Sequence, residues 1–170
     1  MDFTQVVKNR YSCKKYSSKP VPDEAIKAIL ETGRLAPTAK NLQEQHIYLL
    51  RSGESLAKMD SLTPCRYNAP AVLMVAYDKE KVYTYPGGRY TSGAEDAAIV
   101  ATHLILAAYN EGVDSCWVNN YDPDKAAEIF GLPENEAVLC FIDLGYAADG
   151  AGPLPNHFSR KELTETVTEI

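Results

Sequence analysis

The chain has 170 residues, enough for one domain with a sizeable core, and its 45% hydrophobic and 24% charged residues are ordinary for a soluble globular protein. A formal net charge of −6 argues against nucleic acid or an anionic membrane as the main partner. The first residues carry no charged-then-apolar leader, so we expect no export signal and a cytoplasmic location.

The four cysteines and three histidines favour neither disulfides nor a metal site. No Cys-x-x-Cys pair occurs, so we expect reduced and mostly buried thiols. The histidines have no ligand-type spacing with one another or with the cysteines. Rossmann and P-loop glycine motifs and the Gly-x-Ser-x-Gly elbow are also absent from the sequence, although a Ser-His-Asp or Cys-His nucleophile stays open as an alternative.

Residues 10–16 read Arg-Tyr-Ser-Cys-Lys-Lys-Tyr and follow a short helix that Asp2 can cap. In extended backbone, alternate side chains share a face, which places Arg10, Ser12, Lys14 and Tyr16 in one row. The two cations would stand about 13 Å apart. This row predicts a site for a long ligand with a phosphate at one end; a charged, solvated strand edge is the alternative.

The next segments are a helix over residues 23–33 and a loop over residues 35–43. A stripe of apolar residues on one face predicts the helix, and Gly33 predicts that the helix stops near that position. In the loop, Thr38, Asn41 and Gln43 offer donors and acceptors that suit a polar heterocycle. A simple connection is the alternative.

Four segments have the composition of strands: residues 46–51, 71–77, 113–119 and 137–144. The second is a continuous apolar run, which predicts a strand buried on both faces. Helices are expected near residues 55–60 and 122–131; Asp122 can cap the second of these, and Gly131 can end it. We therefore expect an α+β fold with four central strands and a possible fifth in the tail.

The strongest predicted helix begins at a Ser92-x-x-Glu95 capping box and ends before Gly112. It would be about 27 Å long. Its surface is apolar on nearly every side, so it must be buried on nearly every side. Asp96 and His103 interrupt the apolar run and argue against a membrane span. One face of this helix can pack on its own chain and a second face on another copy of the chain, so we expect a homodimer.

Together these segments resemble the FMN-dependent nitroreductase family, and the likeness covers nearly the whole chain. Residues 10–16 match the family's Arg-x-Ser-x-(Arg/Lys)-x-(Phe/Tyr) segment, and residues 36–43 match its Ala-Pro-Ser/Thr-x-x-Asn-x-Gln loop. The long helix, a glycine and hydrophobic strand over residues 112–117, a Gly-Tyr turn and a C-terminal basic pair follow in the family's order.

The resemblance implies a single FMN-binding domain over residues 1–170. Its fold would be a nitroreductase-like three-layer α/β/α sandwich with a central, mainly antiparallel sheet and a long dimer-core helix. The FMN sites would lie at the interface of a homodimer, and the C-terminal arm, about residues 160–170, would pack on the partner subunit. NADH or NADPH would be the electron donor.

The resemblance also implies a role for each candidate site residue. The flavin carries the chemistry, so no catalytic side chain and no metal ligand is expected. The FMN phosphate would be held by Arg10, Ser12 and Arg160, with Lys161. The flavin ring would be met by Lys14 at its N1/O2 edge, by the loop residues Pro37, Thr38, Ala39, Asn41 and Gln43 from the other subunit, and by backbone groups of Trp117, Val118 and Asn119 near N5.

Two departures from the family pattern concern the substrate. Many relatives continue the loop with Pro-Trp, where this chain has Glu44 and Gln45. Residues 78–92 are short and tyrosine-rich, and they suit either a reduced lid or an ordinary surface loop. We expect a nitroaromatic, a quinone or an activated alkene as acceptor. The alternatives are a non-catalytic FMN-storage or sensing module, and a variant acting on flavin or halogenated phenols.

Overall fold

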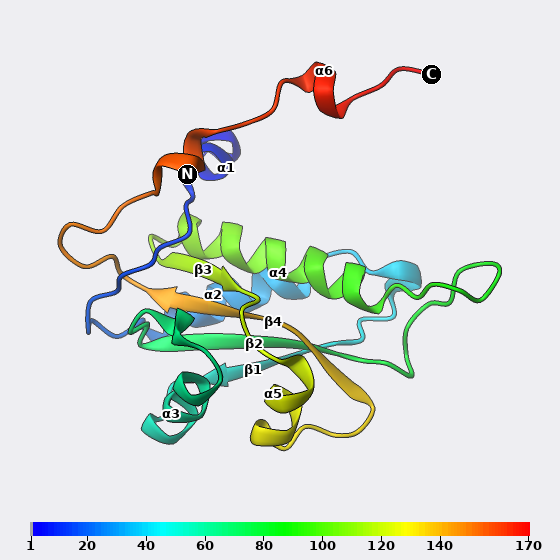
Figure 1. Ribbon diagram of the computed structural model, residues 1–170, viewed down its shortest axis with the longest axis horizontal. Coiled ribbons are helices and arrows are strands. Elements are labelled where there is room, and N and C mark those ends of the chain that lie inside the picture. The colour runs from blue at the N-terminus through cyan, green and yellow to red at the C-terminus, as the bar shows by residue number, and fades with distance from the viewer. Residues whose placement is uncertain (1) are drawn as a thin grey trace.

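The computed structural model describes residues 2–170 and contains a four-stranded antiparallel sheet with helices on both faces (Figure 1). Its spatial order is β1-β2-β4-β3. The strands are β1 (Gln45–Leu50), β2 (Ala71–Asp78), β3 (Asp114–Val118) and β4 (Glu136–Gly145). All four predicted central strands are confirmed, whereas no fifth strand forms in the described part of the tail.

The central strands β2 and β4 form the middle of the core. Residues 71–76 of β2 are all buried, which confirms the prediction from their apolar run. Met74 stands opposite Phe141 of β4 in the register, and both side chains are fully buried. A strand covered on both faces needs apolar side chains at successive positions, and this strand has them.

One face of the sheet is covered by α2 (Asp23–Arg34) and α4 (Gly93–Asn110), above the sheet in Figure 1. Ile29 and Leu104 are fully buried in this layer. α2 ends at Arg34, close to Gly33 as predicted, but Gly33 itself is the last residue but one of the helix and not a residue beyond it. Its role is a close approach between helices, because a Cβ at this position would lie 2.5 Å from Cδ2 of Leu104.

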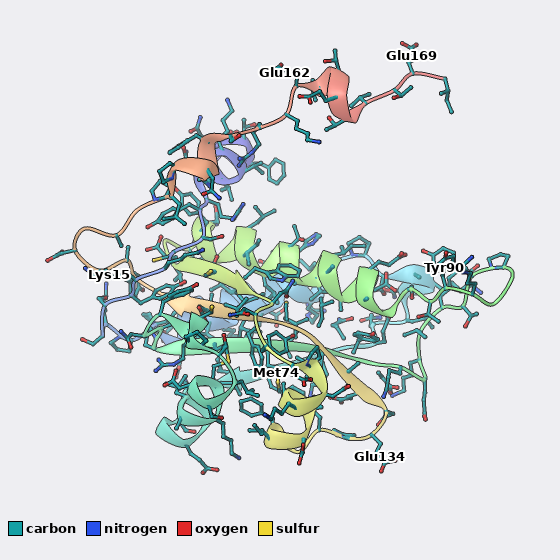
Figure 2. All side chains as sticks on the ribbon, in the orientation of Figure 1. Lys15, Met74, Tyr90, Glu134, Glu162 and Glu169 are labelled. Carbon is teal, nitrogen blue, oxygen red and sulfur yellow. The ribbon has the colours of Figure 1, made fainter. Side chains whose placement is uncertain are left out.

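The opposite face is covered by α3 (Gly53–Leu62) and α5 (Pro123–Phe130). Met59 and Phe141 are fully buried here, and the Tyr121 ring packs edge-on against Phe141 at 4.6 Å. In Figure 2, Met74 lies on this side of the sheet. Two helical layers around one antiparallel sheet confirm the predicted three-layer α/β/α sandwich.

The two ends of α4 differ in how well the sequence predicted them. Gly112 ends the helix with a left-handed φ of 70°, as expected. The predicted capping box at the start is wrong. The Ser92 hydroxyl makes no cap; it accepts from the Tyr83 N–H at 3.1 Å and donates to Oε1 of Glu44 at 3.3 Å. Tertiary partners thus replace the local one.

The chain ends lie outside the three layers. Asp2 caps α1 (Phe3–Asn9) by accepting from two backbone N–H groups, as predicted. The tail after β4 contains the short turn η3 (Pro155–Phe158) and helix α6 (Leu163–Thr166), and it extends away from the body (Figure 1). Glu162 and Glu169 mark this arm in Figure 2. Within residues 2–170, no helix combines the length and the apolar character needed to cross a membrane.

Candidate functional site

The Arg10–Tyr16 segment runs in extended form beside β3, which is one of the two edge strands of the sheet. Ser12 forms a parallel bridge with Ser115 of β3. The Cys13 N–H donates to the Ser115 carbonyl at 3.0 Å. These contacts fix the beginning of the chain against a strand that comes much later in the sequence.

The predicted row of alternating side chains holds only for Ser12 and Lys14; Tyr11 also lines the groove, and Arg10 lies outside its lining. Ser12 and Lys14 face a common groove, and Cys13 between them is fully buried. Tyr16 is only 5% exposed and does not continue the row, so that prediction is wrong. Its ring turns inward because Gly145 leaves room for it; a Cβ on Gly145 would lie 2.8 Å from the ring. Burial of an aromatic ring favours this arrangement.

The groove consists of two adjoining hollows that share Lys14, Cys116 and Trp117. The first has a volume of about 250 Å³ and is completed by Tyr11, Ser12, Leu154, Asn156 and His157. The second has a volume of about 240 Å³ and is completed by Cys65, Tyr67, Val118, Asn119 and Asn120. Ligand pockets usually enclose about 300 Å³ or more. Each hollow therefore provides part of a ligand enclosure.

Arg10 and Arg160, from opposite ends of the chain, lie close enough to influence each other. Burial, and then the positive charge of Arg160, lower the pKa of the Arg10 guanidinium. Arg160 is held by donating to the carbonyls of His157 and, at 2.7 Å, Ser159. Two guanidinium groups near one another suit a dianionic phosphate. Lys161 is exposed, and no described contact links it to this pair.

The end of β3 contributes an aromatic ring and polar groups to the second hollow. Trp117, Val118 and Asn119 all line it. The Trp117 indole N–H donates to Oδ1 of Asn119 at 2.7 Å, which fixes the ring beside the hollow. An aromatic face and nearby amide groups are suitable for a planar polar ring. These three residues thus share a hollow with Lys14, and their role beside a flavin stays a prediction.

Sequence reasoning missed Cys65, Tyr67 and Asn120. Asn120 Nδ2 lies 3.5 Å from the Cys65 sulfur. Hydrogen bonds, first with Tyr67 and then with Asn120, lower the pKa of Cys65, whereas burial raises the pKa of Cys116 to about 12. In the sequence, only the position of Asn120 directly after Asn119, as a second amide side chain, could have suggested it as a candidate. No local signal marks Cys65, because its chain segment reaches the groove only in the folded protein.

The predicted cofactor loop is compact and has unusual backbone angles. Thr38 Oγ1 accepts from the Gln43 N–H at 3.1 Å, and the Gln43 amide donates to the Asn41 carbonyl at 3.3 Å. Asn41 and Gln43 have φ values of 57° and 53°. Left-handed angles are costly for residues other than glycine, so contacts elsewhere must hold this conformation. Pro37 is exposed beside the loop.

This loop and the Arg10 groove contact opposite ends of α4. The Ala39 N–H donates to Oδ1 of Asp96, in the first turn of the helix, at 2.9 Å. Helix α1, which leads directly into Arg10, lies over the last turns, where Val6 shares a hollow with Ala107. The 18 residues of α4 span about 27 Å. The structure therefore does not bring the two predicted groups together within one chain.

Comparisons with known proteins agree with this fold. A family model described as the nitroreductase family matches residues 7–63 and 63–146. A relative from Archaeoglobus fulgidus, with the provisional name NADH dehydrogenase/NAD(P)H nitroreductase, is 32% identical over 152 residues, which are 85% of each chain. A crystal structure of a nitroreductase family protein from Clostridium difficile is 32% identical, with a TM-score of 0.92 over 99% of this chain and 98% of that one.

A more distant structure shares the fold. It comes from Exiguobacterium sibiricum, was solved in complex with FMN, and is 21% identical with a TM-score of 0.87 over 100% of this chain and 98% of that one.

Fold and groove define a three-layer α+β protein with cations, a hydroxyl and an aromatic ring along one sheet edge. The chain belongs to the nitroreductase family, whose model covers most of its length. The resemblance that the sequence motifs suggested is thereby confirmed.

Proposed function

We propose that the protein is a cytoplasmic FMN-dependent NAD(P)H oxidoreductase that acts as a homodimer. The observation that carries this proposal is the approach of Arg10 and Arg160 beside a groove that Ser12 and Lys14 line. A phosphate dianion needs several cations and hydroxyl donors in one place, and the two arginines together with Ser12 can provide them next to the groove. The two guanidinium groups repel each other, and a bound anion between them would offset this repulsion.

The residues of the groove suit the rest of the cofactor. Lys14 lines both hollows, so its ammonium group can lie beside the N1/O2 edge of the flavin and stabilise negative charge there. Trp117 and Asn119 offer a flat face and peptide groups for the ring. Bound FMN supplies the hydride chemistry, so the protein residues bind, orient and shield.

A second copy would complete the site. The loop around Thr38 has the polar groups for a flavin but lies at the far end of α4 from the groove of its own chain. Leu163 and Val167 in the C-terminal arm are 77% and 64% exposed, and Phe3 of α1 is also largely exposed. Several exposed apolar side chains on one protein favour an interface with another chain. We infer that two chains pair so that each groove meets the other chain's loop.

Relatives support an oxidoreductase role. An NADPH-flavin oxidoreductase of Vibrio harveyi is 27% identical over 147 residues, which are 79% of this chain and 61% of that protein. We propose a ping-pong cycle in which NADH or NADPH binds and leaves before a nitroaromatic, quinone or activated-alkene acceptor takes the same place.

An anaerobic titration tests this function. The purified protein is loaded with FMN, and the visible flavin absorbance is followed while NADH or NADPH is added, and then while a nitroaromatic or quinone is added. We expect bleaching by a pyridine nucleotide and recovery with the acceptor. Protein that binds FMN but is not bleached is a binding module, and protein that binds no FMN contradicts the proposal entirely.

Replacement of Arg10 tests the phosphate site. Arg10→Ala should weaken FMN binding by about tenfold or more, because a charge-assisted hydrogen bond to phosphate contributes about 1.5–3 kcal/mol. Riboflavin, which lacks the phosphate, should lose much less affinity. Lys15→Ala is the matched control, because Lys15 donates to the Asp149 carbonyl at 3.0 Å and does not line the groove (Figure 2). Equal losses for FMN and riboflavin would contradict the assignment.

A further inference from the structure

Two acidic side chains are buried together near the start of α4. Glu44 is 4% exposed and Asp96 is 3% exposed. Oδ1 of Asp96 accepts from the Ala39 N–H at 2.9 Å, and Oε1 of Glu44 accepts from the Ser92 hydroxyl at 3.3 Å. The second oxygens, Oε2 of Glu44 and Oδ2 of Asp96, are buried and have no hydrogen-bond partner within residues 2–170. Each acid thus has one oxygen engaged and one remaining.

Both acids lie beside Ser92: its hydroxyl donates to Glu44, and its carbonyl accepts from the Asp96 N–H at 2.8 Å. A hydrogen bond between the acids would give both remaining oxygens a partner. Burial, followed by hydrogen bonding with Asp96, raises the pKa of Glu44. A hydrogen bond between two carboxyl groups requires a proton on one of them, and two facing carboxylates repel strongly in a buried place. One proton between the acids therefore removes both difficulties.

No cation neutralises this pair among the described residues. The charged and titratable groups of the surrounding segments have other partners: Lys40 lies over the Tyr83 ring, Lys81 pairs with Asp78, and Glu95 accepts from the Tyr85 hydroxyl. A buried acid without a cation is more stable when it is protonated. The proton is thus the feature that makes this cluster compatible with burial.

The pair connects three parts of the structure. Asp96 belongs to α4 and holds Ala39 of the predicted cofactor loop. Glu44 follows that loop and holds Ser92, whose hydroxyl accepts from the Tyr83 N–H of the tyrosine-rich segment. The loop contains left-handed residues that need external support. The two acids are well placed to provide that support.

We propose that Glu44 and Asp96 share one proton and, as positioning residues, hold the 37–43 loop and the tyrosine-rich segment in their places on α4. The positioning of a cofactor loop rests on the proposed function; the shared proton does not. As the pH rises the proton is lost, two facing charges remain, and the loop separates from the helix. Flavin affinity should then fall.

The protein without added flavin tests the shared proton. Glu44→Gln puts an amide N–H where the proton lies and keeps an oxygen for Ser92, so it imitates the protonated acid at every pH. As the pH rises from about 4, near the ordinary pKa of a free glutamate, the melting temperature of the wild type should fall relative to that of this variant. The sign follows because a raised pKa in the folded state gives stability that is lost as the pH rises through it.

A matched control removes an exposed acid in the same way. Glu134→Gln lies on the loop before β4, away from the pair (Figure 2), and should keep the pH dependence of the wild type. Parallel melting curves for the wild type and Glu44→Gln across this range would overturn the shared proton.

Flavin binding tests the positioning role. At neutral pH, Glu44→Ala and Asp96→Ala should weaken FMN binding at least tenfold. Glu44→Gln should keep the affinity and should not show the decline that the wild type shows as the pH rises. Wild-type affinity in Glu44→Ala would overturn the positioning role. Absence of FMN binding in every form, the wild type included, would overturn the proposed function, while the melting experiment would still decide the shared proton.

Discussion

Asp143 lies on the central strand β4 and has a buried carboxyl group. It is fully buried, and neither oxygen has a hydrogen-bond partner within residues 2–170. Arg66, a cation whose charge acts on Asp143, already donates to both oxygens of Asp60 and to the Ala69 carbonyl. Burial raises the pKa of Asp143 to about 9, and the charge of Arg66 opposes this only in part. The side chain is therefore protonated at neutral pH.

Asp143→Asn should remove a pH dependence of stability. The unfolded aspartate has a pKa of about 3.9, so the folded protein holds a proton that the unfolded chain has lost between that value and about 9. Stability is full below the lower value and declines as the pH rises. At pH 8 the variant should be more stable than the wild type by about 1 kcal/mol or more, with the difference vanishing near pH 4.

Urea unfolding at the two pH values measures this difference. Asp149→Asn, at an exposed position, is the control and should not change the pH dependence. A wild-type advantage that grows with pH would show that Asp143 is ionised in the fold.

At the scale of elements, α2 and α4 meet at Gly33. The missing side chain allows Leu104 to lie directly against the backbone of α2. Leu104 is fully buried and has little room to move. Helix propensity by itself would favour alanine at a helical position. The packing of the two helices therefore decides this residue.

Gly33→Ala should destabilise the protein by about 1–2 kcal/mol, because overpacking costs more than the helix preference for alanine returns. Gly53→Ala is the control, because a Cβ at that first residue of α3 would meet nothing within 4 Å. Urea unfolding of both variants gives the comparison. Equal stability of the two would mean that Leu104 shifts freely. Leu104→Val should restore part of the loss in the Gly33→Ala background.

At the scale of the whole molecule, the C-terminal arm has apolar side chains that the body of its own chain does not cover. Leu163 and Val167 are mostly exposed, and Ile170 ends the chain. Figure 1 shows the arm extending away from the three layers. Burial of such side chains on a second copy contributes about 1.5 kcal/mol or more for each one. We therefore expect the arm to stabilise the proposed dimer and not the single chain.

Deletion of residues 161–170 keeps Arg160 and removes this contribution. The dimer dissociation constant should rise by about tenfold or more, while the unfolding of the separated chain should change little. Sedimentation over a range of concentrations measures the change. As a control, the full-length chain with Leu163 and Val167 changed to serine should behave like the deletion. A deleted protein that dimerises like the wild type would show that other surfaces form the interface.

The sequence by itself determined the elements whose causes are local. The apolar run of β2, the left-handed Gly112 after α4, and the Asp122 cap and Gly131 stop of α5 all lie where they were expected. Such features depend on neighbours a few residues away, so periodicity and capping chemistry are sufficient to find them.

Only the tertiary structure decided which distant segments meet. It brought Arg160 to Arg10, turned Tyr16 inward against Gly145, replaced the cap at Ser92, and placed the Thr38 loop at the far end of α4. The physical reason is the same in each case. These arrangements depend on burial and charge between residues that are far apart in the chain, and local patterns contain no information about those contacts.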